Sequence, residues 1–184
     1  MTTASGVISG MLALDKAEKL AAKIVAALAP YCERIEIAGS IRRRRPLVND
    51  IDIVCLPKPG DVAPLRERVL TQTSPITEGK EVILTRLKNG VQLDLWLAHQ
   101  PKKDLFTTTP TNFGSLLLCR TGSKEHNIWL VEHAKRLGLS WNPHHGVFGT
   151  CPRRGVNACL ASATEEEIFA VLKLDFVPPE RRER

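Results

Sequence analysis

Residues 38–56 read AGSIRRRRPLVNDIDIVCL, and this stretch decides which fold the chain can adopt. A Gly-Ser pair and four arginines are followed by an apolar run that begins Asp50-Ile51-Asp52. Successive side chains of a β-strand point to opposite faces of the sheet. A strand over residues 50–56 therefore places Asp50 and Asp52 on one face and the isoleucines on the other, against a core.

A third carboxylate follows in the next β-prone segments. Asn89-Gly90 separates residues 81–88 from residues 91–98 and predicts a two-residue hairpin. The alternation of the second segment puts its leucines on one face and Asp94 on the other. If the strands of Asp52 and Asp94 are neighbours, the three aspartates cluster.

Such a cluster favours a divalent cation, because adjacent carboxylates repel and need a counter-charge. Three hard oxygen ligands suit Mg²⁺ and the two-metal route to phosphoryl transfer. The alternative is that Asp-x-Asp is a common pair on exposed strand faces and binds nothing.

The Gly39-Ser40 pair lies where a strand over residues 34–38 ends. Unpaired backbone N–H groups and a hydroxyl at such a turn bind anions, and arginines one turn later can bind phosphate. No G-x-x-x-x-G-K loop is present. Taken alone, residues 42–45 could also be a nuclear localisation patch or a solvated helix face.

The rest of the chain predicts helices around this sheet and a second small domain. Apolar periodicity predicts a helix over residues 11–28, and Asp61 is a candidate N-cap for the next helix. Helices are also expected over residues 111–120, from Ser123 to about 137, and over 165–174, with a weakly β-like stretch up to about 160. The predicted class is α+β, with a mixed-sheet domain over 1–100 and a small α/β domain over 101–184.

Net charge, apolar runs and cysteine spacing indicate what kind of partner and cellular compartment to expect. The formal charge of +6 favours a polyanionic partner. No apolar run reaches the ~20 residues of a membrane span, and residues 1–10 lack a secretion-signal pattern, so we expect a cytoplasmic protein, bacterial or phage-encoded, without a membrane partner. Five cysteines without C-x-x-C spacing indicate reduced thiols. His144, His145, Cys151 and Cys159 do not have the spacing of a standard zinc site.

Several motifs together resemble the family X DNA polymerases, the polymerase beta type. Gly39-Ser40-x-Arg42-Arg43, Asp50-x-Asp52 and Asp94 resemble the palm of that family. Residues 121–127, TGSKEHN, resemble its palm–thumb junction, and residues 164–169 and 178–181 resemble its closing motifs. The resemblance spans about residues 14–181.

The resemblance implies a nucleotidyltransferase palm followed by a thumb, and it implies a role for each matching residue. Asp50 and Asp52 would ligate two Mg²⁺ or Mn²⁺ ions, and Asp94 would ligate the catalytic ion beside the primer 3′-hydroxyl. Nucleotide-binding residues would be Gly39, Ser40, Arg43, Cys119, Arg120, Gly122 and Asn127, with Ser40 and Arg43 on the phosphates, Gly122 under the sugar and Asn127 at the base. The implied partners are gapped or nicked duplex DNA and deoxynucleoside triphosphates, bound by a monomer.

The departures from the family pattern carry their own expectations. One helix precedes the palm strand where the family usually has further DNA-binding regions, so we expect no lyase activity on abasic ends. Cys119-Arg120 replaces an aromatic pair that excludes ribonucleotides, which predicts reduced sugar discrimination. Val131 replaces an arginine that contacts the template, which predicts reduced fidelity. The alternatives are a template-independent or other-acceptor nucleotidyltransferase and a non-catalytic DNA-binding module.

Overall fold

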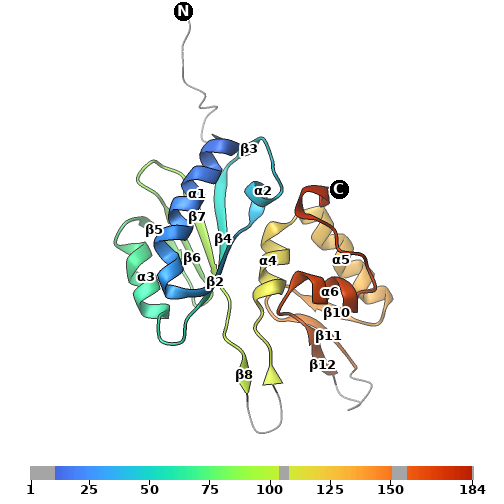
Figure 1. Cartoon of the computed structure of the whole chain (residues 1–184). Coiled ribbons are helices and arrows are strands. Elements are labelled where there is room, and N and C mark those ends of the chain that lie inside the picture. Colours follow the sequence, from blue (N-terminus) through green and yellow to red (C-terminus); the bar gives the residue numbers. More distant parts are fainter. Residues whose placement is uncertain (1–10, 104–107, 151–156, 184) are drawn as a thin grey trace, which may run out of the picture.

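The structure is a computed structural model that describes residues 11–103, 108–150 and 157–183 (Figure 1). The helical elements are α1 Leu14–Leu28, η1 Ala29–Tyr31, α2 Gly39–Arg42, α3 Val62–Leu70, α4 Phe113–Thr121, α5 Lys124–Arg136, α6 Glu165–Val171 and η2 Pro179–Arg181. The strands are β1 Leu12–Ala13, β2 Cys32–Ile37, β3 Leu47–Val48, β4 Asp50–Pro57, β5 Ser74–Glu78, β6 Val82–Arg86, β7 Gln92–Leu97, β8 Lys102–Lys103, β9 Thr108–Thr109, β10 Ser140–Asn142, β11 Gly146–Thr150 and β12 Asn157–Ala161.

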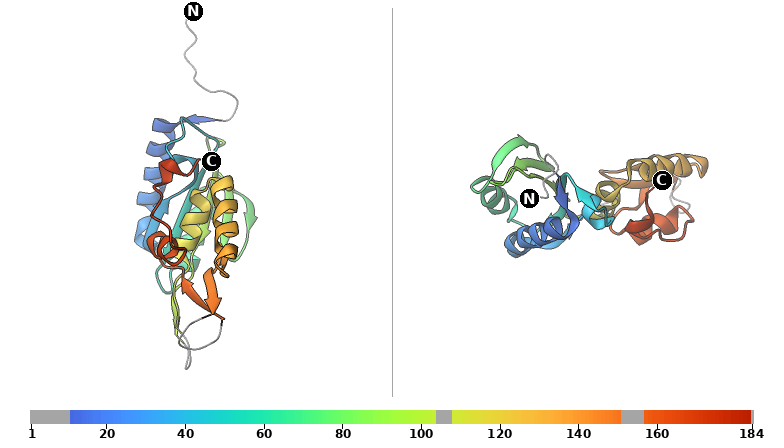
Figure 2. Two further views of the ribbon diagram at one scale, coloured as in Figure 1. Left: turned by 90° about the vertical axis from the view of Figure 1, so that its right-hand side faces the viewer. Right: turned by 90° about the horizontal axis from the view of Figure 1, so that it is seen from above.

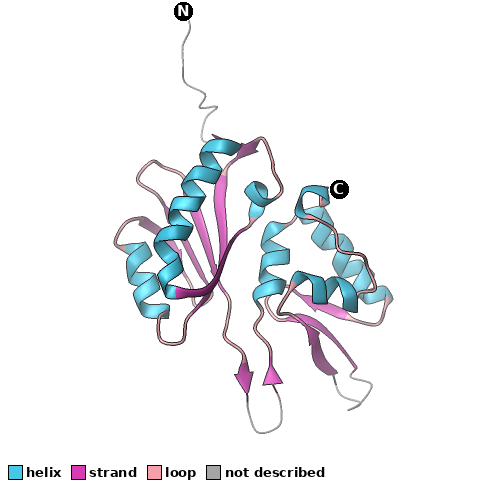
Figure 3. Cartoon of the chain, viewed as in Figure 1, coloured by secondary structure: helices cyan, strands magenta, loops and turns pink. Residues whose placement is uncertain are grey.

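A mixed five-stranded sheet forms the first half of the molecule, with strand order β2-β4-β7-β6-β5 (Figure 3). Strands β4 and β7 are parallel neighbours, while the other pairs are antiparallel. The predicted hairpin joins β6 to β7, but its loop holds three residues, 88–90, rather than two, because the Leu87 N–H donates to the Val91 carbonyl at 2.8 Å. The predicted α+β class with a mixed sheet is confirmed.

The two faces of this sheet are covered unequally. Helices α1 and α3 bury one face, and their apolar residues pack against Ile51, Ile53 and Leu95. On the other face, α4 covers only the end at Val54 and Leu56. The end of that face with the aspartates therefore keeps access to a cavity.

The second half contains the three-stranded sheet β10-β11-β12 with α5 and α6. Its core includes Leu130, Trp141, Ile168 and Phe169. Viewed from above, the two halves lie side by side (Figure 2). Because each half has its own apolar cluster, we propose the domain division near residue 101.

The predicted N-cap residues precede three helices, and at two of them the side chain makes the capping hydrogen bond. The Ser123 hydroxyl accepts from the His126 N–H at 3.2 Å, and the Thr164 hydroxyl accepts from the Glu167 N–H at 3.1 Å. Asp61 precedes α3, but its side chain makes no capping hydrogen bond. Its backbone N–H instead closes a turn on the Lys58 carbonyl at 3.0 Å.

The first helix is shorter than predicted, because tertiary pairing overrides the helical pattern. Leu12 pairs with Val48, so residues 12–13 form a strand and α1 begins at Leu14. No helix in the described ranges combines the length and the apolar character that a membrane span needs.

A buried ion network joins the two halves behind α2. Glu165 accepts two hydrogen bonds from Arg42, at 2.8 and 2.7 Å, and one from Arg182 at 2.6 Å. Arg42 also donates to the Thr121 hydroxyl at 2.8 Å. These contacts hold the short helix α2, whose first residues are the Gly39-Ser40 pair, against the second half.

Candidate active site

The three predicted aspartates lie on the same face of the sheet. In the parallel β4–β7 pair, Asp52 is aligned with Asp94, and Asp50 with Gln92. All three aspartates are partly buried, while Ile51, Ile53 and Leu95 are fully buried on the opposite face. The strand alternation predicted from the sequence therefore places the carboxylates on neighbouring strands.

These carboxylates influence one another's protonation. Burial raises the pKa of Asp52 to about 7, and the negative charges of Asp50 and Asp94 add to this shift. Burial also raises the pKa of Asp94, although the hydrogen bond from Gln92 opposes this rise. The cluster is thus short of positive charge, and a divalent cation would favour its ionised form.

The carboxylates of the three aspartates do not converge on a common point. Gln92 Nε2 donates to Asp94 Oδ1 at 2.8 Å, and the Asp52 carboxylate lies against Gly39. Accordingly, no group of three or more His, Cys, Asp or Glu side chains in the described residues is set up as a metal site. The donor set is nonetheless the hard-oxygen type that Mg²⁺ and Mn²⁺ prefer, and its excess of negative charge fits a cation.

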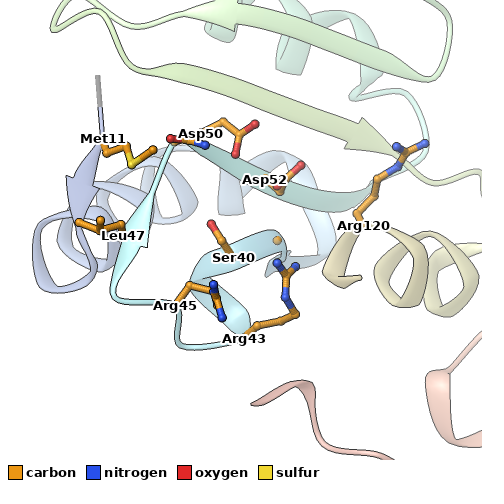
Figure 4. Close-up of a pocket in the computed structure, with 10 residues that line it drawn as sticks. Met11, Ser40, Arg43, Arg45, Leu47, Asp50, Asp52 and Arg120 are labelled. Atoms are coloured by element: carbon orange, nitrogen blue, oxygen red, sulfur yellow. The ribbon is translucent and has the colours of Figure 1, made fainter. Parts of the chain in front are cut away.

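A cavity of about 490 Å³ opens beside Asp50 and Asp52, while Asp94 is not among its lining residues (Figure 4). Its lining residues are Met11, Gly39, Ser40, Arg43, Arg45, Leu47, Asn49, Asp50, Asp52 and Arg120. The Ser40 hydroxyl is buried and has no hydrogen-bond partner among the described residues. A buried hydroxyl without a partner is unfavourable, so this group fits an anionic ligand that would accept a hydrogen bond from it.

Gly39 is required at the edge of this cavity for two reasons. Its φ is +59°, a conformation that residues with a Cβ rarely adopt. A Cβ there would also lie 2.1 Å from Asp52 Oδ2. The glycine thus lets the Gly-Ser turn approach the aspartate strand.

A second cavity, of about 550 Å³, lies on the side of the second half and shares Arg43 and Arg120 with the first. The predicted residues Cys119, Gly122 and Asn127 line it. The other lining residues are Lys124, Ile128, Val131, Glu132, Lys135, Trp141 and Pro143. The predicted nucleotide-binding residues therefore lie along two cavities that meet at Arg43 and Arg120.

Asn127 and Gly122 each show a feature that suits a ligand. Asn127 Nδ2 donates to the Cys119 carbonyl at 2.8 Å, while its Oδ1 is buried without a partner among the described residues. Gly122 has φ +72°, and a Cβ there would lie 3.1 Å from Arg43 Nη1. Asn127 thus offers an acceptor, and Gly122 leaves room for the arginine.

Arg120 links the two halves at the other side of the cavities. Its guanidinium stacks over the Trp96 ring at 3.3 Å from the centroid, and Nη2 lies 3.4 Å from His144 Nε2. The positive charge lowers the pKa values of Asp52 and Asp94, but burial outweighs this effect at both. Position 120 therefore carries a cation close to the aspartates.

Sequence reasoning missed several residues that the fold brings to the site. Arg45 and Asn49 line the first cavity, while Lys124 and Lys135 line the second. Glu183, which follows the closing motif, was missed as well; its carboxylate accepts from Arg43 Nε at 2.6 Å. Arg45 belongs to the arginine run, so proximity to Arg43 was the only available signal for it.

Of the four residues considered for zinc, Cys151 lies outside the described residues, and the described His and Cys residues form no metal group. Trp141 is 5% exposed and donates to the Ser115 hydroxyl at 2.9 Å, so it is a core residue.

Comparisons with known proteins agree with the motifs. Residues 116–183 match the family model of the DNA polymerase beta thumb. The DNA polymerase/3′-5′ exonuclease PolX of Bacillus subtilis (strain 168) is 30% identical over 153 residues, which is 79% of this chain. That alignment covers 24% of the PolX protein, so the chain spans about a quarter of its relative's length.

The fold is similar to that of a polymerase structure. The ternary primer/template complex of Leishmania infantum polymerase beta aligns with a TM-score of 0.70 and 20% sequence identity. The alignment covers 96% of this chain and 78% of that chain. At this identity the similarity establishes the fold.

Proposed function

Because this chain is related to the family X DNA polymerases through its thumb, its sequence motifs and its fold, we propose that it is a metal-dependent DNA polymerase. It adds nucleotides to a primer 3′-hydroxyl, and its substrate is duplex DNA with short gaps or nicks. The observation that carries the proposal is the parallel alignment of Asp52 with Asp94 beside the Ser40 cavity.

The proposed reaction forms a bond between the primer 3′-oxygen and the α-phosphorus of the nucleotide, and pyrophosphate leaves. Asp50 and Asp52 would hold two Mg²⁺ or Mn²⁺ ions, and Asp94 would be a further ligand of one of them; the ions would supply charge stabilisation. Asp94 would also assist the loss of the proton from the primer hydroxyl. Catalysis of this kind depends on positioning and electrostatics rather than on covalent intermediates.

The other residues bind the nucleotide. The Ser40 hydroxyl and the Arg43 guanidinium contact the phosphates, because both face the cavity of the aspartates. Gly122 and Asn127 line the adjoining cavity, where the sugar and base bind. Lys124 and Lys135 in the same cavity, together with the net charge of +6, favour the DNA backbone.

Sugar selectivity follows from position 120. A guanidinium held on Trp96 does not present the flat aromatic edge that would clash with a 2′-hydroxyl. We propose that the enzyme accepts ribonucleotides and discriminates against them by less than about a thousand-fold, since a larger factor needs a dedicated clash. Low fidelity, a monomeric state and a cytoplasmic setting stay predictions.

The test is primer extension on a gapped duplex with Mg²⁺. Wild-type protein should extend the primer, whereas Asp50→Asn and Asp94→Asn should not. Asp61→Asn is the matched control, because its side chain makes no capping bond and lies outside both cavities. Extension that survives Asp94→Asn would rule out the assigned role.

The same assay separates the alternatives. Extension of a single-stranded primer, without preference for the template base, would indicate a template-independent transferase. Binding of DNA without any incorporation would indicate a non-catalytic module. A ribonucleotide arm in each reaction measures sugar discrimination directly.

A further inference from the structure

The Arg43 side chain is held from behind by a carboxylate at the end of the described chain. Glu183 Oε1 accepts from Arg43 Nε at 2.6 Å, and the same oxygen lies 3.7 Å from Arg45 Nε. Both arginines line the cavity of the aspartates. Glu183 is 140 residues away from Arg43 in sequence, so this contact depends on how the second half docks.

A second hydrogen bond holds the same guanidinium. Arg43 Nη1 donates to the Thr121 carbonyl at the junction between α4 and α5. An arginine has five N–H groups, and these two bonds use two of them. The described residues provide Arg43 with no other hydrogen bond, and the close-up shows its terminal nitrogens on the side of Ser40 (Figure 4).

The backbone that carries Glu183 is itself well held. The neighbouring Arg182 is fully buried, and its side chain donates to Glu165 at 2.6 Å and to the Val177 carbonyl at 2.8 Å. The Arg182 carbonyl accepts from the Ser123 hydroxyl at 2.7 Å. Glu183 therefore extends from a rigid segment, and its side chain can fix the position of Arg43.

We propose that Glu183 is a positioning residue for phosphate binding: it holds the Nε edge of Arg43 so that the terminal nitrogens face the cavity. This inference rests on the proposed role of Arg43 in binding phosphate. A carboxylate that competed with the ligand would occupy the terminal nitrogens, whereas Glu183 binds at Nε. Thr121 uses one N–H of Nη1, and the remaining terminal N–H groups stay available. Preorganised arginines bind anions better because less side-chain freedom is lost on binding.

The test measures binding of inorganic tripolyphosphate to the full chain by calorimetry, so that it does not depend on polymerase activity. Glu183→Ala should weaken binding about five-fold, because Arg43 then samples other rotamers. Glu183→Gln keeps a hydrogen-bond acceptor and should weaken it about two-fold. Glu180→Ala is the matched control, since that exposed glutamate lies nearby and forms no ion pair with Arg43. Arg43→Ala marks full loss of the contact.

A kinetic readout separates positioning from a purely structural role. In primer extension, Glu183→Ala should raise the KM for the nucleotide by the same factor and leave kcat within about two-fold. Tighter tripolyphosphate binding in Glu183→Ala would overturn the proposal and make Glu183 a competitor. Unchanged binding, or no binding to the wild type, would also overturn it. Loss of binding in Glu183→Ala together with no extension by the wild type would support the inference and reject the polymerase proposal.

Discussion

Two acidic side chains on either side of α2 have opposite surroundings. Asp52 faces Asp50 and Asp94, and burial together with their charges raises its pKa to about 7. Glu165 is also buried, which raises its pKa, but the hydrogen bonds from Arg42 and Arg182 outweigh burial and bring the pKa below its ordinary value. At Asp52 the charges of Arg120 and Arg43 are too weak to offset burial, whereas Glu165 has two arginines bound directly to it.

This difference separates a binding site from a structural one. The charge of Glu165 is balanced by arginines of the protein itself, and these ion pairs join the two halves of the molecule. The aspartate face lies in an environment that destabilises its ionised state, which is expected where a ligand supplies the missing charge. The same reasoning applies to the Ser40 hydroxyl, which is buried without a partner in the described chain.

The largest effect is expected from a substitution in the aspartate cluster. Asp52→Asn should reduce primer extension by about a thousand-fold or more, because the site loses a metal ligand. Without metal at pH 8, the same variant should unfold at a higher temperature than the wild type, because a repulsive charge is removed. Activity above a tenth of wild type, or a lower melting temperature, would contradict this prediction.

The next largest effect is expected at Glu165, whose charge is balanced by two arginines. Glu165→Gln leaves Arg42 and Arg182 without their carboxylate and should destabilise the protein by about 3 kcal/mol. Urea denaturation would measure the loss. Glu166→Gln, an exposed neighbour, should change stability by less than about 0.5 kcal/mol. Similar stabilities of the two variants would show that the network is not important for folding.

A smaller effect concerns the close approach of α2 to the aspartate strand. Gly39→Ala should destabilise the protein by about 2 kcal/mol, because it combines a positive φ with a clash against Asp52. Gly60→Ala has a positive φ but open space around it, so it should lose only about 1 kcal/mol. Equal losses in thermal or urea unfolding would mean that the contact with Asp52 can relax.

The two carboxylates should also give stability opposite slopes with pH. The raised pKa of Asp52 makes the metal-free protein lose stability as pH rises from about 4 to 7. The lowered pKa of Glu165 gives a contribution that is complete above about pH 4 and is lost as pH falls through the folded-state value. Melting temperatures between pH 3 and 8 in a chelator would test both. Asp52→Asn should remove the loss near neutral pH, and Glu165→Gln should flatten the acid limb.

Much of the site could be predicted from local sequence. Strand alternation placed Asp50, Asp52 and Asp94 on the polar faces of their strands, and Asn89-Gly90 correctly predicted the hairpin. The caps at Ser123 and Thr164 were predicted because a cap involves residues only three positions apart. These features depend only on residues that are close in sequence, so local sequence patterns are enough to predict them.

Other features needed the tertiary structure. Only the sheet shows that β4 and β7 are parallel neighbours and that Asp52 is aligned with Asp94. Strand pairing with residue 48 decided where α1 begins, and Asp61 stands at the N-cap of α3 without a side-chain capping bond. These outcomes depend on which distant segments pack together, and local periodicity does not specify that choice.

The sequence by itself determined which residues could bind metal and phosphate, because side-chain chemistry and strand alternation are local properties. The tertiary structure decided which charges are compensated. Arg42 meets Glu165 and Arg43 meets Glu183 across 123 and 140 residues of chain, and contacts of that range form only when the two halves dock. The four arginines of the opening stretch look alike in sequence, but the fold gives Arg42 a buried structural partner and leaves Arg43 facing the aspartate cavity.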